Sequence, residues 1–270
     1  MSGSVRSTLR ALPTLLRIGV AETIAYRAEF LIWMLTTTMP LVMLALWTSV
    51  AHEGVFAGYG TKEFVAYFLL ALIVRNLTSS WVVWQINDEV RRGVLSMRLL
   101  RPVHPFVAYA ATHLSAVPLR GLIVLPVAVI LLLTSARDVI TDDPVRIALL
   151  APSLALAWVL TFALMLAIGG LAFFFDKSMA VMDVYFGVFA VLSGYLLPLP
   201  LLPDWLSDVA RYAPFRYLLS APIELMIRTD LDTVGALGLV GAQLAWAAAL
   251  GAIALAVWNA GIRRFEAVGA

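Results

Sequence analysis

The residues best suited to a specific polar contact lie together between Ile86 and Pro105, in the stretch "INDEVRRGVLSMRLLRPVHP". This stretch holds an Asp–Glu pair, four arginines and a glycine, whereas the chain on both sides is largely apolar. Guanidinium groups make planar, two-pronged contacts with carboxylates. The chemistry that these residues offer is therefore charge-assisted hydrogen bonding rather than bond breaking.

An apolar stripe accompanies these charges. Val90, Val94 and Met97 recur at spacings of four and three residues, which places them on one face of a helix. We expect a short amphipathic helix that continues from the preceding apolar run, with Asn87 or Asp88 as its N-cap and the two prolines at its end. The alternative is a solvated loop whose arginines only fix the membrane topology.

A second polar group stands inside an apolar run. Arg75 lies near the middle of "FVAYFLLALIVRNLTSSWVVWQI", and we expect Asn76, Ser79 and Ser80 to share a broad helical face with it. Two hypotheses compete: the face is a bundle-interior contact with neighbouring helices, or it lines a translocation path and meets a polar or anionic part of the cargo. Arg120 is expected near the cytoplasmic end of its span, where it can snorkel.

Other catalytic chemistry has little support. Neither Lys62 nor Lys177 follows a glycine, so there is no phosphate-binding Gly-Lys-Ser/Thr loop. The chain has no cysteine, and its three histidines form no zinc motif. We expect His104 and His113 to be solvated at the membrane interface. The sequence predicts no catalytic residue, no metal site and no cofactor in this chain.

The composition is that of an integral membrane protein. Of 270 residues, 62% are hydrophobic and 13% charged, with a mean hydropathy of +0.92, whereas soluble domains have about a quarter of their residues charged. The net charge of +2 is too small to predict a nucleic-acid partner.

Six apolar runs are long enough to cross a bilayer as helices, which need about 20 residues each. The predicted spans are Phe30–Val50, Phe64–Ile86, Leu114–Ser135, Ile147–Phe175, Met179–Leu197 and Val234–Trp258. Residues 1–29 predict an amphipathic helix in the membrane interface, kinked or split at Pro13. The chain 1–270 reads as a single all-α membrane domain.

Basic residues predict the orientation. With the N-terminus in the cytoplasm, eleven basic residues fall inside and six outside, which favours both termini in the cytoplasm. The outer residues are Lys62, Arg137, Arg146, Arg211, Arg216 and Arg228. Residues 87–105 are then cytoplasmic.

The outer segment 198–233 is apolar yet too short to span, so its pieces should be interfacial or re-entrant helices. One helix is expected in "PDWLSDVARYAP", capped by Asp204. Another is expected in "FRYLLSAPIELMIR", broken at Pro222. In the last span, the pairs Gly238–Ala242 and Ala247–Gly251 allow close helix contact, and internal packing is favoured over a dimer seam. Gly169 and Gly170 are interpreted in the same way.

The pattern acidic–variable–basic–basic–Gly–apolar followed by "LLRPV" resembles the first cytoplasmic loop of type-2 ABC-transporter permeases, in the six-span bacterial branch formerly grouped as an uncharacterised permease family. The stretch "YAPFRYLLSAPIEL" resembles that branch's outer segment before the last span. The resemblance covers nearly the whole chain.

The resemblance implies an interfacial elbow helix, six spans and a cytoplasmic coupling helix. It implies an exporter subunit of the bacterial plasma membrane that forms the translocation path, pairs with a second permease as a homodimer or heterodimer, and sits on a separate ABC ATPase that holds ATP and Mg²⁺. The residues that fall on the coupling segment, and would dock on the ATPase, are Asp88, Glu89, Arg91, Arg92 and Gly93.

Two other functions stay open at this point. The first is a membrane enzyme acting on lipid or glycan, which should show carboxylates or histidines clustered near one interface. The second is an ATP-independent channel or scaffold. The sequence does not reveal the substrate.

Overall fold

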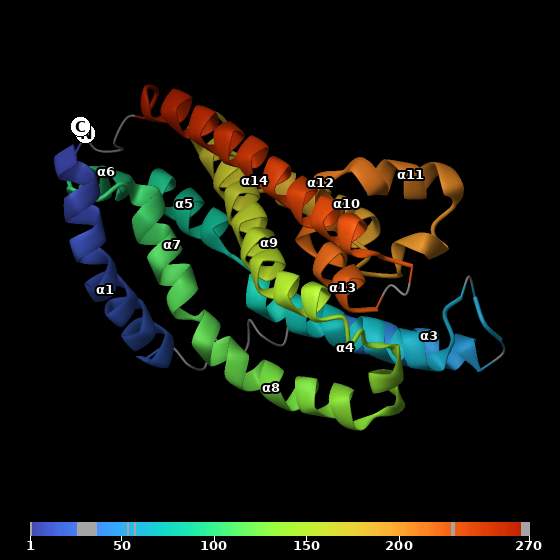
Figure 1. Ribbon diagram of the computed structural model, residues 1–270. Coiled ribbons are helices and arrows are strands. Elements are labelled where there is room, and N and C mark those ends of the chain that lie inside the picture. The colour runs from blue at the N-terminus through green and yellow to red at the C-terminus, as the bar shows by residue number, and fades with distance from the viewer. Residues whose placement is uncertain (1, 26–36, 53, 57, 228–229, 266–270) are drawn as a thin grey trace.

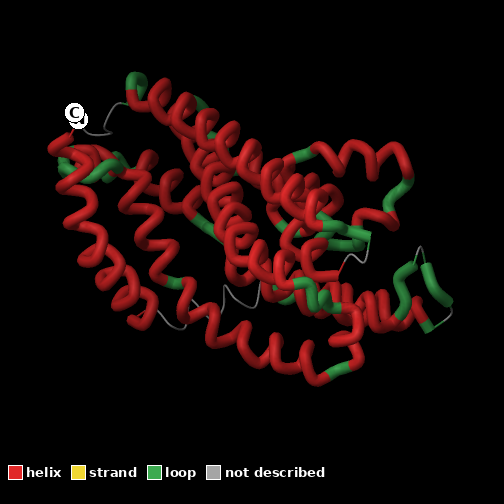
Figure 2. Tube along the Cα trace, in the orientation of Figure 1, coloured by secondary structure: helices red, strands yellow, loops and turns green. Residues whose placement is uncertain are grey.

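The computed structural model describes residues 2–25, 37–52, 54–56, 58–227 and 230–265, which form a bundle of helices (Figure 1). Within these ranges no strand occurs, and only the isolated bridge between Phe56 and Tyr59 departs from helix and loop (Figure 2). The prediction of an all-α membrane protein is confirmed.

Within the described ranges, four segments are long and apolar enough to cross a membrane: Thr61–Arg91, Pro105–Leu133, Pro144–Phe173 and Thr233–Ile262. The helices that form them are α4 (Thr61–Thr78) with α5 (Val82–Arg91), α7 (Pro105–Ser115) with α8 (Val117–Leu133), α9 (Pro144–Gly170) with the short η2 (Leu171–Phe173), and α14 (Thr233–Ile262). These correspond to four of the six predicted spans.

The other two predicted spans coincide with shorter helices. Phe30–Val50 overlaps α3 (Met39–Ala51), but residues 30–36 lie outside the described residues; Met179–Leu197 overlaps α10 (Ala180–Leu192). Each helix has 13 residues and is too short to cross alone. Six crossings therefore stay a prediction.

The core of the bundle lies around α4 and α9. Helix α14 runs along α9, α5 also packs on α9, and α3 and α8 flank α4. The side chains of Phe64, Phe68 and Leu160 are fully buried there. Gly169 lets the backbone of α9 approach Val83 and Ile86 of α5, and Gly170 faces Val257 of α14, so the twin glycines serve internal packing.

Polar caps fix where the long helices begin. Asp143 accepts a hydrogen bond from the Val145 N–H (2.8 Å), and Asp232 accepts one from the Gly235 N–H (2.8 Å). His104 caps α7 by accepting from the Phe106 N–H (3.2 Å). Burial lowers the pKa of His104, which favours the neutral imidazole that this bond needs.

The expected amphipathic helix from Asn87 to Leu100 is not continuous. Helix α5 runs through Asn87 and Asp88 to Arg91, so neither residue is an N-cap, and α6 (Leu95–Leu99) is a separate short helix. Gly93 joins them with φ +72°, a left-handed backbone that other residues rarely adopt. The glycine explains why the chain turns here.

The segment between α10 and α14 also differs from its prediction. It contains η3 (Leu199–Leu201), α11 (Asp204–Tyr212), α12 (Pro214–Leu218) and α13 (Ser220–Ile227). Asp204 lies in the first turn of α11 but makes no side-chain cap. The break predicted at Pro222 falls at Leu219 instead, because a proline in the first turn of α13 needs no backbone donor.

The structure excludes one alternative for the N-terminal helix and corrects one expectation for α14. Helix α1 (Ser2–Ala25) passes through Pro13 without splitting, and it runs beside α7 with Gly19 against Ser115 (Figure 1). In α14, a Cβ added at Gly238 or Gly251 would meet no neighbouring atom, so these glycines do not serve contacts within the described bundle.

The bundle has two ends, which allows its topology to be tested. Helix α6 lies at the end where α1 begins and α14 finishes, and the loop before α9 lies at the other (Figure 1). Single cysteines replacing the exposed residues Arg101 and Asp142 should therefore react with an impermeant thiol reagent from opposite sides of the membrane. Labelling of both from the outside would contradict this arrangement.

Gly194 should be essential for stability. Its φ is +83°, and a Cβ there would lie 2.2 Å from the Tyr67 hydroxyl and 2.3 Å from Ser220 Oγ. We expect Gly194→Ala to lower the free energy of unfolding by more than the roughly 1–2 kcal/mol that a left-handed backbone costs an L-residue. Thermal unfolding in detergent measures this, with Gly241→Ala as control, because its Cβ would enter open space.

Candidate functional site

The charged segment after α5 forms one end of the bundle, and its acidic residues have different environments. Asp88 pairs with Arg92 at 2.7 Å, with both side chains more than half exposed. Such a pair contributes little to stability. The side chain of Arg91 forms no ion pair among the described residues and is exposed. These residues are accessible to a partner.

Glu89, in contrast, is turned inward. Arg98 of α6 donates two hydrogen bonds to its carboxylate, from Nε to Oε2 at 2.8 Å and from Nη2 to Oε1 at 2.5 Å. The Tyr109 hydroxyl of α7 donates to the same carboxylate at 2.6 Å, and Gln85 donates at 3.2 Å. The Arg98 guanidinium also lies 4.4 Å from the Tyr109 ring centroid.

We call Glu89, Arg98 and Tyr109 the Glu89 bracket, because it fastens α5, α6 and α7 together. Its ionic side chains are only 12% and 19% exposed, so the pair is largely shielded from water. The family resemblance implies a docking role for Glu89, and the sequence pattern indicates neither of its partners. Arg98 is nine residues away, and nothing in the sequence singles out Tyr109.

The predicted apolar stripe is divided: Val90 packs against the core of the bundle, whereas Val94 and Met97 are exposed, as is Leu100 at the end of α6. Val94, Met97 and Leu100 are 51%, 65% and 80% accessible. Beside them lie Arg92 and Arg101, also exposed. Contiguous exposed apolar side chains outside a span indicate a contact with another protein or with lipid.

The polar residues predicted around Arg75 are all buried, but they do not share one helical face. Helix α4 ends at Thr78, and Ser79 and Ser80 form the break before α5. Asn76 accepts from Thr37 (3.2 Å) and donates to the Leu72 carbonyl (2.8 Å). The Arg75 guanidinium lies 4.8 Å from the centroid of the Phe189 ring.

Arg120 does not snorkel. The span that holds it begins at Pro105, not at Leu114, so Arg120 lies at mid-span and is 7% exposed. One of its terminal nitrogens donates to the Ser79 carbonyl (2.6 Å) and lies 3.1 Å from Ser79 Oγ. His113, expected at the interface, has a buried Nε2 without a hydrogen-bond partner.

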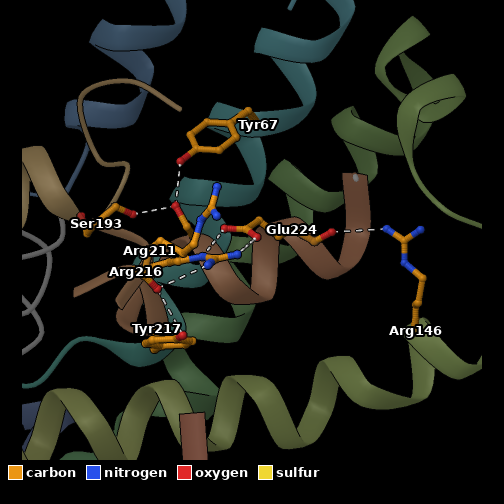
Figure 3. A network of polar contacts seen from close by, with 8 residues as sticks. Tyr67, Arg146, Ser193, Arg211, Arg216, Tyr217 and Glu224 are labelled. Atoms are coloured by element: carbon orange, nitrogen blue, oxygen red, sulfur yellow. Dashed lines mark hydrogen bonds and ion pairs between the residues drawn. The ribbon is translucent and has the colours of Figure 1, made fainter. Parts of the chain in front are cut away.

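A third polar region joins helices at the other end of the bundle (Figure 3). The Arg216 guanidinium donates two hydrogen bonds to the Glu224 carboxylate, at 2.9 and 2.5 Å. Arg146 donates one to the Leu225 carbonyl at 2.8 Å. Tyr67 donates to the Gly194 carbonyl at 2.7 Å. Sequence analysis counted these arginines as topology signals and did not predict their contacts.

A cavity of about 490 Å³ opens beside this region. Its lining includes Tyr59, Tyr67, Arg211, Arg216 and Glu224. The nearby network has a structural explanation, because the Arg216–Glu224 pair joins α12 to α13 and the contact between Tyr67 and Ser220 holds α13 against α4. Among the described residues, no cluster of acidic and histidine side chains could hold a metal ion.

Glu89→Gln should loosen the bracket while preserving its shape. The neutral amide of glutamine keeps one acceptor oxygen but loses the second oxygen and the negative charge, so it cannot replace both bonds from Arg98, each of which contributes roughly 1.5–3 kcal/mol. We expect a lower unfolding temperature of the purified protein in detergent. Asp88→Gln, which breaks an exposed pair, is the control and should change the unfolding temperature little. Equal effects of the two substitutions would contradict the distinction drawn here.

No curated protein gives a match to the chain. The family described as "ABC-2 family transporter protein" matches residues 31–269, which covers the bundle from before α3 to the end of α14. The resemblance found in the sequence is thereby confirmed. The chain belongs to the ABC-2 transporter family and is a membrane permease of the ABC type.

Proposed function

We propose that the chain is the membrane-spanning subunit of an ATP-driven exporter and that a separate ABC ATPase binds the surface formed by Val94, Met97, Leu100 and the exposed arginines around them. We call this the docking surface. The family match supports the transport role. The absence of a Gly-Lys-Ser/Thr loop from the sequence supports a separate subunit for ATP hydrolysis.

The exposure of the apolar side chains of the docking surface, at one end of the bundle, is the observation that carries this proposal. Met97 and Leu100 are the most exposed large apolar side chains of α6 and its end, at 65% and 80%. An apolar centre surrounded by arginine is the usual composition of a protein–protein interface. An acidic groove on the ATPase would complement Arg91, Arg92 and Arg101.

The Glu89 bracket gives the docking surface a mechanical link to the membrane. A displacement of α6 would be transmitted to α5 through the Arg98–Glu89 ion pair. It would be transmitted to α7 through the hydrogen bond between Glu89 and Tyr109. Helices α5 and α7 are the ends of two membrane-crossing segments. Closure of an ATPase dimer could thus move both segments, provided that its contacts with α6 differ between its two states.

The remaining parts of the proposal concern assembly and place. The permease works as a dimer, with a second copy or a related permease as its partner, and both termini face the cytoplasm of a bacterial cell. ATP and Mg²⁺ bind the ATPase subunit. The excess of basic residues on the side of α6 supports this orientation.

The decisive experiment replaces one apolar side chain of the docking surface. Met97→Glu introduces a charge that binding would have to desolvate, so we expect copurification with the ABC ATPase encoded beside the permease to weaken on the order of ten- to a hundredfold, the range of a lost interface anchor. Stimulation of ATP hydrolysis should fall in parallel. Membrane insertion should be unchanged.

Val209→Glu is the matched control, because Val209 is 51% exposed on α11, away from the docking surface. Equal ATPase binding by wild type and Met97→Glu would exclude α6 as the docking surface. Failure of the wild-type permease to bind or stimulate any ABC ATPase encoded near it would contradict the proposed function itself.

A further inference from the structure

Two membrane-crossing segments break at mid-depth, and each carries a buried arginine close to its break. Arg75 is residue 15 of the 31 from Thr61 to Arg91, four positions before the break at Ser79–Trp81. Arg120 is residue 16 of the 29 from Pro105 to Leu133, just after the junction of α7 and α8 at Ala116. Discontinuous helices at the middle of a membrane recur at the substrate sites of transporters.

The two guanidinium groups lie in the same region of the interior. Arg75 is 8% exposed and Arg120 is 7% exposed, and they are near enough for their positive charges to repel each other. Among the described residues, neither takes part in an ion pair. Two buried cations without a carboxylate are unfavourable in a membrane, where a single charge is already costly.

The existing contacts of the two arginines leave much of their donor capacity unused. Arg75 packs against the rings of Phe189 (4.8 Å) and Tyr195 (5.8 Å), while its buried Nε has no hydrogen-bond partner. The hydrogen bonds of Arg120 in the described structure go to Ser79 through one nitrogen. Each guanidinium carries five N–H donors.

Other unsatisfied polar atoms surround the same place. The Ser80 hydroxyl and the Nε2 atom of His113 are buried without a hydrogen-bond partner, and the Tyr185 hydroxyl lies beside the Arg75 guanidinium without a well-aligned hydrogen bond. Ser80 lies in the break, Tyr185 is a neighbour of Arg75, and His113 is near enough to Arg120 to sense its charge. Buried polar groups are normally satisfied, so such a group of exceptions requires an explanation.

We propose that this cluster, Arg75 and Arg120 with Ser80 and Tyr185, binds the phosphate-type anionic group of the cargo. Two cations match the charge of about −1.5 to −2 that a phosphate monoester carries, and the guanidinium and hydroxyl donors match its three terminal oxygens. A carboxylate would leave one positive charge uncompensated. Helix α5 begins at Val82, and the positive end of its dipole adds to the attraction for the anion.

This inference rests on the proposed transport function and specifies the chemical class of the cargo. In the present conformation Phe189 of α10 covers the Arg75 guanidinium. An anion that approaches Arg75 from this side would have to displace the Phe189 ring.

The test uses the full-length permease, without ATPase, in nanodiscs of phosphatidylcholine. Two probes are compared: phosphatidic acid added to the lipid, and inorganic phosphate added to the buffer. We expect one of them to raise the unfolding temperature of the wild type in a saturable manner. Arg75→Gln and Arg120→Gln should each weaken that response about tenfold or more, because each removes charge-assisted bonds.

The two probes distinguish the source of the anion. A response to phosphatidic acid alone indicates a lipid headgroup, and a response to inorganic phosphate alone indicates a soluble phosphate compound. Arg211→Gln is the control, because Arg211 lies on α11 at the cavity rather than in the cluster. It should respond as the wild type does.

Stability without any probe provides an independent readout. If the two arginines form an empty anion site, Arg75→Gln removes the charge that repels Arg120. The substitution should then leave the unfolding temperature in neutral lipid unchanged or raise it. Arg75→Lys keeps the charge but loses the planar donor geometry, and it should fold while binding more weakly.

The proposal is overturned if the wild type responds to neither probe, or if both glutamine variants respond as strongly as the wild type. These outcomes do not bear on the ATPase contact, which copurification through α6 tests separately. A permease that binds its ATPase but no phosphate-type anion would keep the proposed function and lose this inference.

Discussion

The hydrogen bond from Arg120 to the Ser79 carbonyl is the contact on which the centre of this bundle depends. A break in a membrane-crossing helix frees backbone groups that water cannot satisfy, so another part of the protein must satisfy them. Arg120 does this at 2.6 Å from the neighbouring segment. The contact satisfies a backbone carbonyl at the break. It also places the Arg120 guanidinium in the interior near that of Arg75, which makes the centre of the bundle polar and positively charged.

From this centre, a continuous set of contacts leads to the exposed end of the bundle. Helix α5 runs from the break to Glu89, and α7 runs from the Ala116 junction back to Tyr109, where both meet Arg98. The two broken segments are thus joined twice, at mid-depth by Arg120 and at the end by the Glu89 bracket. A displacement of α6 would act on both breaks together, which is the geometry that coupling between an ATPase and a buried site needs.

Sequence reasoning succeeded where one physical preference dominates. The length of the apolar runs determined the four long spans to within a few residues at most ends, and the twin glycines Gly169 and Gly170 indicated close packing. It failed where tertiary contacts decide: the inward turn of Glu89 depends on Arg98 and Tyr109 from other helices. The error at Arg120 came from starting its span at Leu114, because the polar residues before it concealed that α7 already belongs to the crossing.

The arginines of this chain illustrate how burial alone does not reveal a role. Arg146 is as buried as Arg75, but its guanidinium is directed to the carbonyls of Glu224 and Leu225, so its charge is met by backbone dipoles. Arg216 has a carboxylate on Glu224. Arg75 has neither, and aromatic rings compensate a buried cation only in part. A stable fold could have placed leucine at that position, so the retained charge is better explained by an anion that enters and leaves than by the packing of helices.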